Sequence, residues 1–131
     1  MIQQESILQV SDNSGAKTIK CIKTLGGYKK KTATIGQIII TSVQELRNKS
    51  KITSKVKKGE IYKALIIRTK KTIRKKDGTF ISSNKNTKKH NAAILVNKKG
   101  NPIGTRISEP IPFKIKKKQF MKFINISPGL I

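Results

Sequence analysis

The sequence predicts a mainly β protein, a small β-barrel followed by a short helical C-terminal segment. Short apolar runs rich in β-branched residues are separated by turns containing Gly, Asn, Asp or Pro. Apolar residues return at helical spacing only near the C-terminus. The length of 131 residues suits one domain. We expect a β-barrel with basic loops over residues 1–108 and a helical tail over residues 109–131.

The N-terminal part of the chain is expected to supply two strands, Ile7–Val10 and Lys17–Leu25, joined by a turn rich in Ser, Asp and Asn. On the second strand Ile19 and Cys21 share one face, with Lys23 as the next position on that face. Cys21 is the only cysteine, so it cannot form an internal disulfide. We therefore predict a buried, small apolar role for this residue.

The middle of the chain holds the strand around which the rest is arranged. Ile35–Val43 is predicted as a strand, and Arg47–Lys58 is polar enough to be a long hairpin or loop. Ile61–Ile67 follows as a short apolar run, which favours a buried strand. Thr79–Ser82 is predicted to pair with it across an Asp-Gly turn. Ser83–Asn91 has few apolar residues and is expected to be a flexible loop.

The C-terminal part is predicted to contain two more strands and one helix. Ala92–Val96 is a compact apolar strand, and Ile103–Ile107 is expected to be the last strand. Ile115–Ile126 has the spacing of an amphipathic helix that docks on the barrel rather than inserting into a membrane. The side chains expected on its apolar face are Phe120, Met121, Phe123 and Ile124.

The charge balance points to a polyanionic partner. Thirty Lys and Arg residues against six Asp and Glu residues give a net charge of +24, which a compact domain tolerates poorly on its own. Basic clusters flank the central strand, and seven of the fourteen positions from 63 to 76 are Lys or Arg with no acid among them. Nucleic acid is the leading candidate. The alternative, an anionic membrane, calls for a basic amphipathic helix with a bulky apolar face.

Signals for catalysis and metal binding are weak. The six acidic residues are scattered, and the sequence has no P-loop, dinucleotide fingerprint or CxxC motif. Asp12 and Ser14 fit a turn better than a catalytic pair, because no base is near them in the sequence. His90 is the only histidine and has no cysteine cluster to join. We expect no enzyme activity, no cofactor, no metal site and no membrane partner.

The balance among basic and aromatic residues indicates how nucleic acid would be recognised. Lysine outnumbers arginine by 26 to 4, and lysine contacts phosphate without reading bases. Recognition should therefore follow the shape of a folded RNA. The alternative, a free single-stranded nucleic-acid binder on an OB-like barrel, needs several exposed aromatics on one sheet face. The candidates outside the tail are Tyr28, Tyr62, Phe80 and Phe113.

Five blocks of the sequence form a recognisable pattern: Ser11–Lys17 (SDNSGAK), Cys21–Gly27 (CIKTLGG), Val56–Thr79, Asn101–Ile107 (NPIGTRI) and Phe120–Lys122 (FMK). In the same order, these blocks closely resemble the universal large-subunit ribosomal protein family L-fourteen, of the bacterial and organellar type. The resemblance runs from end to end.

The resemblance implies a five-stranded β-barrel with a projecting β-ribbon and a C-terminal segment containing short helices. It implies a structural constituent of the large ribosomal subunit that binds large-subunit rRNA and helps to form inter-subunit bridges with small-subunit rRNA. The neighbouring proteins that it implies belong to the L-nineteen and L-three families. A ribosome-silencing factor is a further implied partner.

The candidate site residues fall into three sets. The RTKK and IRKKDG motifs carry over as rRNA contacts at Arg68, Lys70, Lys71, Arg74, Lys75 and Lys76. The other basic loops add Lys29, Lys30, Lys31, Lys57 and Lys58 as expected phosphate contacts. The silencing-factor motif positions match Thr105, Arg106 and Lys122.

Two loops depart from the family pattern, and the composition is biased. Asn48–Lys55 lacks the usual Pro-Arg-Gly-Lys, and Ser83–Asn91 replaces a short aromatic-containing link, so relatives' contacts there cannot be transferred. The excess of Lys, Ile and Asn indicates an A/T-rich genome. We expect a ribosome of an organelle, namely a mitochondrion with its own genome, or otherwise the cytoplasm of an A/T-rich organism. The N-terminus has neither a signal-peptide nor an Arg-rich transit pattern.

Overall fold

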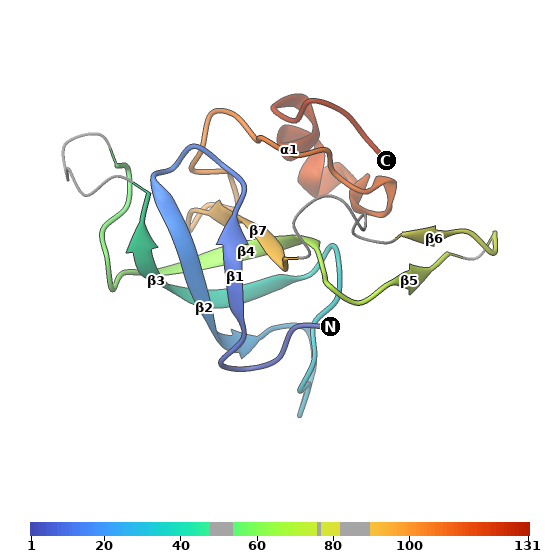
Figure 1. Ribbon diagram of the computed structural model, residues 1–131, viewed down its shortest axis with the longest axis horizontal. Coiled ribbons are helices and arrows are strands. Elements are labelled where there is room, and N and C mark those ends of the chain that lie inside the picture. The colour runs from blue at the N-terminus through green and yellow to red at the C-terminus, as the bar shows by residue number, and fades with distance from the viewer. Residues whose placement is uncertain (48–53, 76, 82–89) are drawn as a thin grey trace.

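Five strands form a closed barrel in the order β1-β2-β3-β4-β7 (Figure 1). The computed structural model describes residues 1–47, 54–75, 77–81 and 90–131. The barrel strands are β1 (Ile7–Val10), β2 (Ala16–Thr24), β3 (Ile38–Leu46), β4 (Ile61–Arg68) and β7 (Ala92–Val96). The predicted fold class, a mainly β protein with a small five-stranded barrel, is confirmed. Most of the loop at Asn48–Lys55 and of the loop at Ser83–Asn91 lies outside the described residues.

The barrel closes through one parallel pair. Consecutive barrel strands pair antiparallel, with Leu8 opposite Ile19 and Ile39 opposite Ala64. β1 and β7 then run parallel, with Gln9 opposite Ala92. Closure leaves none of the five strands as an edge, so none of them is a template for edge-to-edge pairing.

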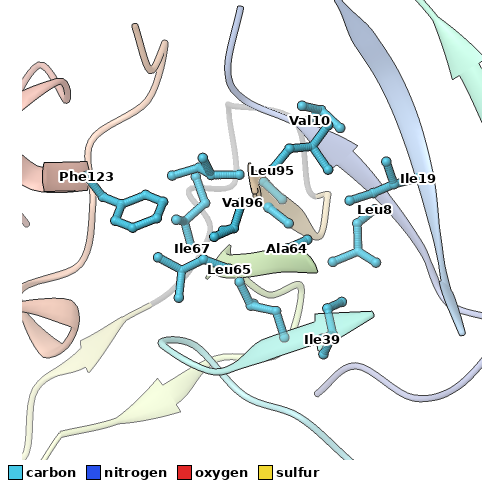
Figure 2. Close-up of a cluster of buried hydrophobic side chains, with 14 of the residues drawn as sticks. Leu8, Val10, Ile19, Ile39, Ala64, Leu65, Ile67, Leu95, Val96 and Phe123 are labelled. Atoms are coloured by element: carbon cyan, nitrogen blue, oxygen red, sulfur yellow. The ribbon is translucent and has the colours of Figure 1, made fainter. Parts of the chain in front are cut away.

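The strand β7 and the second half of β4, residues 64–67, are buried on both faces, which explains why both stretches are continuously apolar. Ala64 of β4 lies opposite Leu95 of β7 and points into the barrel, whereas Leu65 lies opposite Ile94 on the outer face. Figure 2 shows the two sets: Leu8, Ile19, Ile39 and Ala64 gather inside the barrel, while Leu65 and Ile67 face Phe123 of the C-terminal segment.

The register of β2 changes where a β-bulge interrupts its pairing with β3. Ile19 and Cys21 are fully buried, as predicted, and burial followed by the nearby charge of Glu5 raises the pKa of the Cys21 thiol. The bulge lies between Cys21 and Lys23. Because it shifts the alternation by one residue, Lys23 is exposed and Thr24 takes the inward position. The placement of Lys23 on the inward face is therefore wrong.

A separate two-stranded ribbon is inserted between β4 and β7. It consists of β5 (Ile73–Arg74) and β6 (Phe80–Ile81), and it extends away from the barrel (Figure 1). The segment around Phe80 does form a hairpin across Asp77-Gly78, but its partner is β5 and not the central strand. The central strand has no free side, because β3 and β7 already flank it.

The predicted strand Ile103–Ile107 does not form. The Asn13 side chain accepts the backbone N–H groups of Thr105 and Arg106 at 2.8 and 3.2 Å, so these donors are not available to a strand neighbour. Among the described residues, isolated bridges rather than a strand pairing join positions 102–107 to the rest of the fold, one between Pro102 and Val96 and one between Ile107 and Asp12.

The tail contains three short helices in place of the single predicted helix: η1 (Phe113–Ile115), η2 (Lys118–Phe120) and α1 (Met121–Asn125). Lys117 is extended and separates the first two. One continuous helix would stack the lysines of positions 114–118 on neighbouring turns, where like charges repel. Phe120 and Phe123 are buried as expected, with their rings edge to face at 5.8 Å, whereas Met121 is exposed.

Candidate nucleic-acid interface

The predicted basic residues lie in three separate places around the barrel. One group precedes β4, a second follows it and continues into the β5–β6 ribbon, and a third occupies the connection between β2 and β3 (Figure 1). The first two groups are separated by the length of β4, roughly 25 Å for eight residues. The barrel therefore spaces cationic loops around its circumference and does not gather them in one cleft.

Arg68, at the end of β4, is held by the protein itself. Its Nε donates to the carbonyl oxygen of His90 at 3.1 Å, and its Nη1 lies 2.8 Å from Oε2 of Glu109. Both charged side chains are mostly covered, at 22% and 30% exposed. The remaining Nη2 is buried and has no hydrogen-bond partner among the described residues. Arg68 is therefore held at the end of β4 by His90 and Glu109, and its contact with rRNA stays a prediction.

Lys70 and Lys71 lie in the turn between β4 and the ribbon, and both are exposed. Two hydrogen bonds to the backbone fix this turn, and neither of them uses a lysine ammonium group. The Lys70 backbone N–H donates to Oδ1 of Asn91 at 2.8 Å, and the buried Thr69 hydroxyl donates to the Lys71 carbonyl at 3.0 Å. Two lysines are thus presented to solvent on a rigid backbone.

The ribbon carries Arg74, which is exposed, and Lys75, which is partly exposed. Lys76 lies outside the described residues. The hairpin is closed by a bond from the Lys75 N–H to the Thr79 carbonyl at 2.7 Å. Asp77 accepts both the backbone N–H and the hydroxyl of Thr79, at 3.0 and 2.7 Å, and these bonds lower the pKa of its carboxyl group. The single acid of this turn is therefore engaged in shaping it.

The loop before β4 presents Lys57 and Lys58, both exposed. Its turn is set by Glu60, whose Oε2 accepts the Lys57 N–H at 3.0 Å and the Tyr62 hydroxyl at 2.6 Å. The bond to Glu60, with smaller effects of burial and the Glu60 charge, raises the pKa of Tyr62 to about 12. The same bonds lower the pKa of Glu60. As in the ribbon, one acid orders a turn whose lysines point outward.

The third group, Lys29–Lys31, lines a surface hollow of about 750 Å³ together with Gln3, Gln4 and residues 22–24. The Lys30 carbonyl accepts the Thr24 hydroxyl at 2.6 Å, which fixes the loop against β2. The Lys29 ammonium lies 5.4 Å from the centre of the exposed Tyr28 ring. The hollow has a cationic rim and amide groups on its wall, a surface suited to an anion.

The candidate factor-docking residues are positioned by the turn at Asp12 and Asn13. Thr105 exchanges two bonds with the Asn13 side chain, and the Arg106 carbonyl accepts the Asn13 N–H at 3.2 Å. Lys122 of α1 reaches the same stretch of chain, because its Nζ donates to Oδ1 of Asn101 at 3.0 Å. Thr105 and Arg106 are exposed, and so is Lys122.

Sequence reasoning missed the residues that hold these groups in place. Asp12 is buried and accepts the backbone N–H groups of Ser14 and Leu95, both at 2.9 Å. Asn13, Asn91 and Glu109 anchor segments that are distant in the chain. The turn signal at Asp12-Asn13 was visible in the sequence, but nothing local showed that these side chains would bond residues more than eighty positions away.

Two features are absent from the part of the chain that the structure describes. No group of three or more His, Cys, Asp or Glu side chains within that part of the chain is arranged to hold a metal ion. Over the same residues, no helix is long and apolar enough to cross a membrane.

Comparison with protein families identifies the chain. The model of the family described as ribosomal protein L14p/L23e matches residues 1–131, which is the whole chain. The chain therefore belongs to this family, and it is a structural protein of the large ribosomal subunit.

Proposed function

We propose that this member of the L14p/L23e family binds large-subunit rRNA through the basic loops and ribbon, and contributes to inter-subunit bridges with small-subunit rRNA. The observation that carries the proposal is the arrangement of charge. The cations stand on turns whose backbones are fixed by neutral or acidic neighbours, around a barrel whose core is complete without them. A domain with a net charge of +24 is relieved of self-repulsion when phosphates lie against it.

Phosphate contact is assigned to the lysines and the arginine that are open to solvent. These residues are Lys29, Lys30, Lys31, Lys57, Lys58, Lys70, Lys71, Arg74 and Lys75, with Lys76 added from the sequence. Arg68 supports the site by holding the base of the ribbon against Glu109. Because lysine ammonium groups do not read bases, the fit depends on where a folded RNA places its phosphates. Three separated cationic groups suit an RNA surface that surrounds the barrel.

We also propose partner proteins for this chain and the kind of ribosome to which it belongs. Thr105, Arg106 and Lys122 form a surface for a ribosome-silencing factor, and proteins of the L-nineteen and L-three families lie beside the barrel. Residues 1–108 and 109–131 act as one domain, since the Ile107 N–H donates to the Ile126 carbonyl at 3.1 Å and Phe123 packs into the core. The Lys, Ile and Asn bias supports a bacterial or organellar type and a mitochondrial ribosome.

The test compares two variants that lose the same charge. Changing Arg74, Lys75 and Lys76 to Gln together should weaken binding to large-subunit rRNA and flatten its salt dependence. Losing three phosphate contacts lowers the slope of log K against log salt by about 2 to 3. The control changes Lys114, Lys116 and Lys117, all exposed on the tail, to Gln. Equal slopes for the ribbon variant and the unmodified protein would reject the ribbon as an rRNA contact.

Sedimentation separates a subunit component from a free RNA binder. A tagged copy should migrate with large subunits through a sucrose gradient at about 0.5 M salt, where screening strips loosely held basic proteins. Release to the top of the gradient would favour the free single-stranded nucleic-acid binder instead.

A further inference from the structure

We infer that the outward face of the β5–β6 ribbon binds one unpaired nucleotide of the RNA, with the base stacked on the Phe80 ring and a phosphate held by Arg74. The inference rests on the proposed function and specifies how one of its contacts is made. It adds an aromatic residue to a site that the family resemblance describes through cations alone.

The ribbon's register places these two side chains together. Arg74 lies directly opposite Phe80 in the antiparallel pair, so their side chains share one face of the ribbon. The preceding residue, Ile73, is partly buried and packs against the hydrophobic core. Because neighbours along a strand point to opposite faces, the face with Arg74 and Phe80 is turned away from the core.

Phe80 is an exposed aromatic residue, at 65% exposed, on the ribbon face that is turned away from the core. Tyr28 and Phe113 are also exposed, but each has a lysine ammonium over its ring, at 5.4 and 5.1 Å. Within the described residues no such cation lies over Phe80. A base can therefore stack on the Phe80 ring without displacing a cation from it.

The charge around the ring selects the partner. Arg74 lies opposite Phe80, Lys75 follows Arg74 in the same ribbon, and the carboxylate of Asp77 in the turn is taken up by Thr79. This setting favours an anionic partner with a flat apolar face, which describes a nucleotide. A base inside a duplex is stacked on both sides, so the ring can reach only a base in a loop, bulge or end.

The Phe80→Leu variant tests stacking, because it keeps an apolar side chain and removes the aromatic ring. The matched control, Phe80→Tyr, keeps the ring. The probes are a single-stranded RNA of about 12 nucleotides carrying one 2-aminopurine, and the duplex of this strand with its complement. Phe80→Leu should weaken binding of the full chain to the single strand by roughly 5- to 150-fold and abolish the 2-aminopurine quenching. Binding to the duplex and the salt slope should not change, and Phe80→Tyr should behave as the unmodified protein.

In the binding experiment, either of two outcomes would overturn the inference. One is equal affinity of the Phe80→Leu and unmodified proteins for the single strand, and the other is an equal loss of affinity for the single strand and the duplex. Failure of the broader function looks different, because the variant lacking Arg74, Lys75 and Lys76 charges would then bind as the unmodified protein does.

Chemical probing of assembled large subunits provides the second measurement. Phe80→Leu should increase reactivity at an unpaired rRNA nucleotide. Release of a neighbouring protein with unchanged rRNA reactivity would assign Phe80 to a protein contact and overturn the inference.

Discussion

The barrel and the β5–β6 ribbon are both built from β-strands, but a barrel strand has two neighbours and a ribbon strand has one. In the barrel, every strand has two neighbours, and β7 and residues 64–67 of β4 are buried on both faces. In the ribbon, each strand has two residues and one partner, and Ile73 alone among its described side chains packs against the core. A two-stranded hairpin of this kind is marginal in water by itself. The ribbon therefore depends on the barrel for its position and, as we propose, on RNA for its use.

The difference predicts where substitutions act. Changes in the barrel core should alter the free energy of unfolding and leave the RNA contacts of the folded protein intact. Changes on the outward face of the ribbon should alter RNA binding and leave unfolding unchanged.

Leu95→Ala should destabilise the protein by about 2–5 kcal/mol, because Leu95 is fully buried inside the barrel and its truncation leaves a cavity. Urea unfolding followed by far-UV circular dichroism measures the change. The matched control is Ile7→Ala, at a β1 side chain that is 62% exposed, with an expected change within about 0.5 kcal/mol. Similar losses in the two variants would contradict the described barrel interior.

Gly104→Ala should cost about 1–3 kcal/mol, because a Cβ there would lie 2.8 Å from Cβ of Asp12 and 2.9 Å from Oδ1 of Asn13. The Asn13 side chain holds the segment that carries Thr105 and Arg106, and the Asp12 carboxylate holds Leu95 of β7. Thermal unfolding checks the prediction, with Gly129→Ala as control, since nothing lies within 4 Å of a Cβ at that position. If Gly104→Ala melts like Gly129→Ala, the close approach at Asp12 is wrong.

Glu109→Gln should cost about 1–2 kcal/mol, between the values typical of exposed and buried ion pairs, because it leaves the mostly covered Arg68 without its counter-charge. Urea unfolding again provides the measurement. Glu45→Gln is the control, since its pair with Lys17 is 57–61% exposed and should matter little. Since Arg68 also holds the His90 carbonyl, next to the Asn91 side chain that accepts the Lys70 N–H, we also expect faster amide exchange at residues 70–74. Exchange that is unchanged there would show that the ribbon does not depend on this pair.

The smallest expected effect is local to the ribbon and depends on pH. The folded-state pKa of Asp77 is lowered, first by the Thr79 hydroxyl and then by the Thr79 backbone N–H. The contribution of these bonds is therefore complete above the ordinary pKa of 3.8 and is lost as the pH falls through the lower folded-state value. The chemical shift of the Thr79 amide should follow this titration without global unfolding. Thr79→Val should raise the Asp77 pKa, and a midpoint that stays fixed in this variant would contradict the assignment.

The sequence alone was sufficient to predict features that depend on neighbouring residues. The runs at 7–10, 61–67 and 92–96 were apolar enough to predict strands, and all three formed, with residues 64–67 and 92–96 buried. The excess of basic residues was equally plain and pointed to a polyanion. Family resemblance supplied the projecting ribbon and the short helices of the tail, which apolar spacing alone rendered as one helix. The predicted ends of the strands were less accurate: β3 begins at Ile38, whereas the sequence predicted Ile35.

Only the tertiary structure decided which polar groups meet. Asn13 captures the backbone of Thr105 and Arg106 and so prevents a strand, and Glu109 occupies Arg68. The β2 bulge turns Lys23 outward, and the closed barrel leaves β6 to pair with β5. Hydrophobic periodicity reports which side of a strand avoids water, a property of neighbouring residues. Hydrogen bonds and ion pairs between segments far apart in the chain depend on how the barrel closes, and no local pattern encodes that.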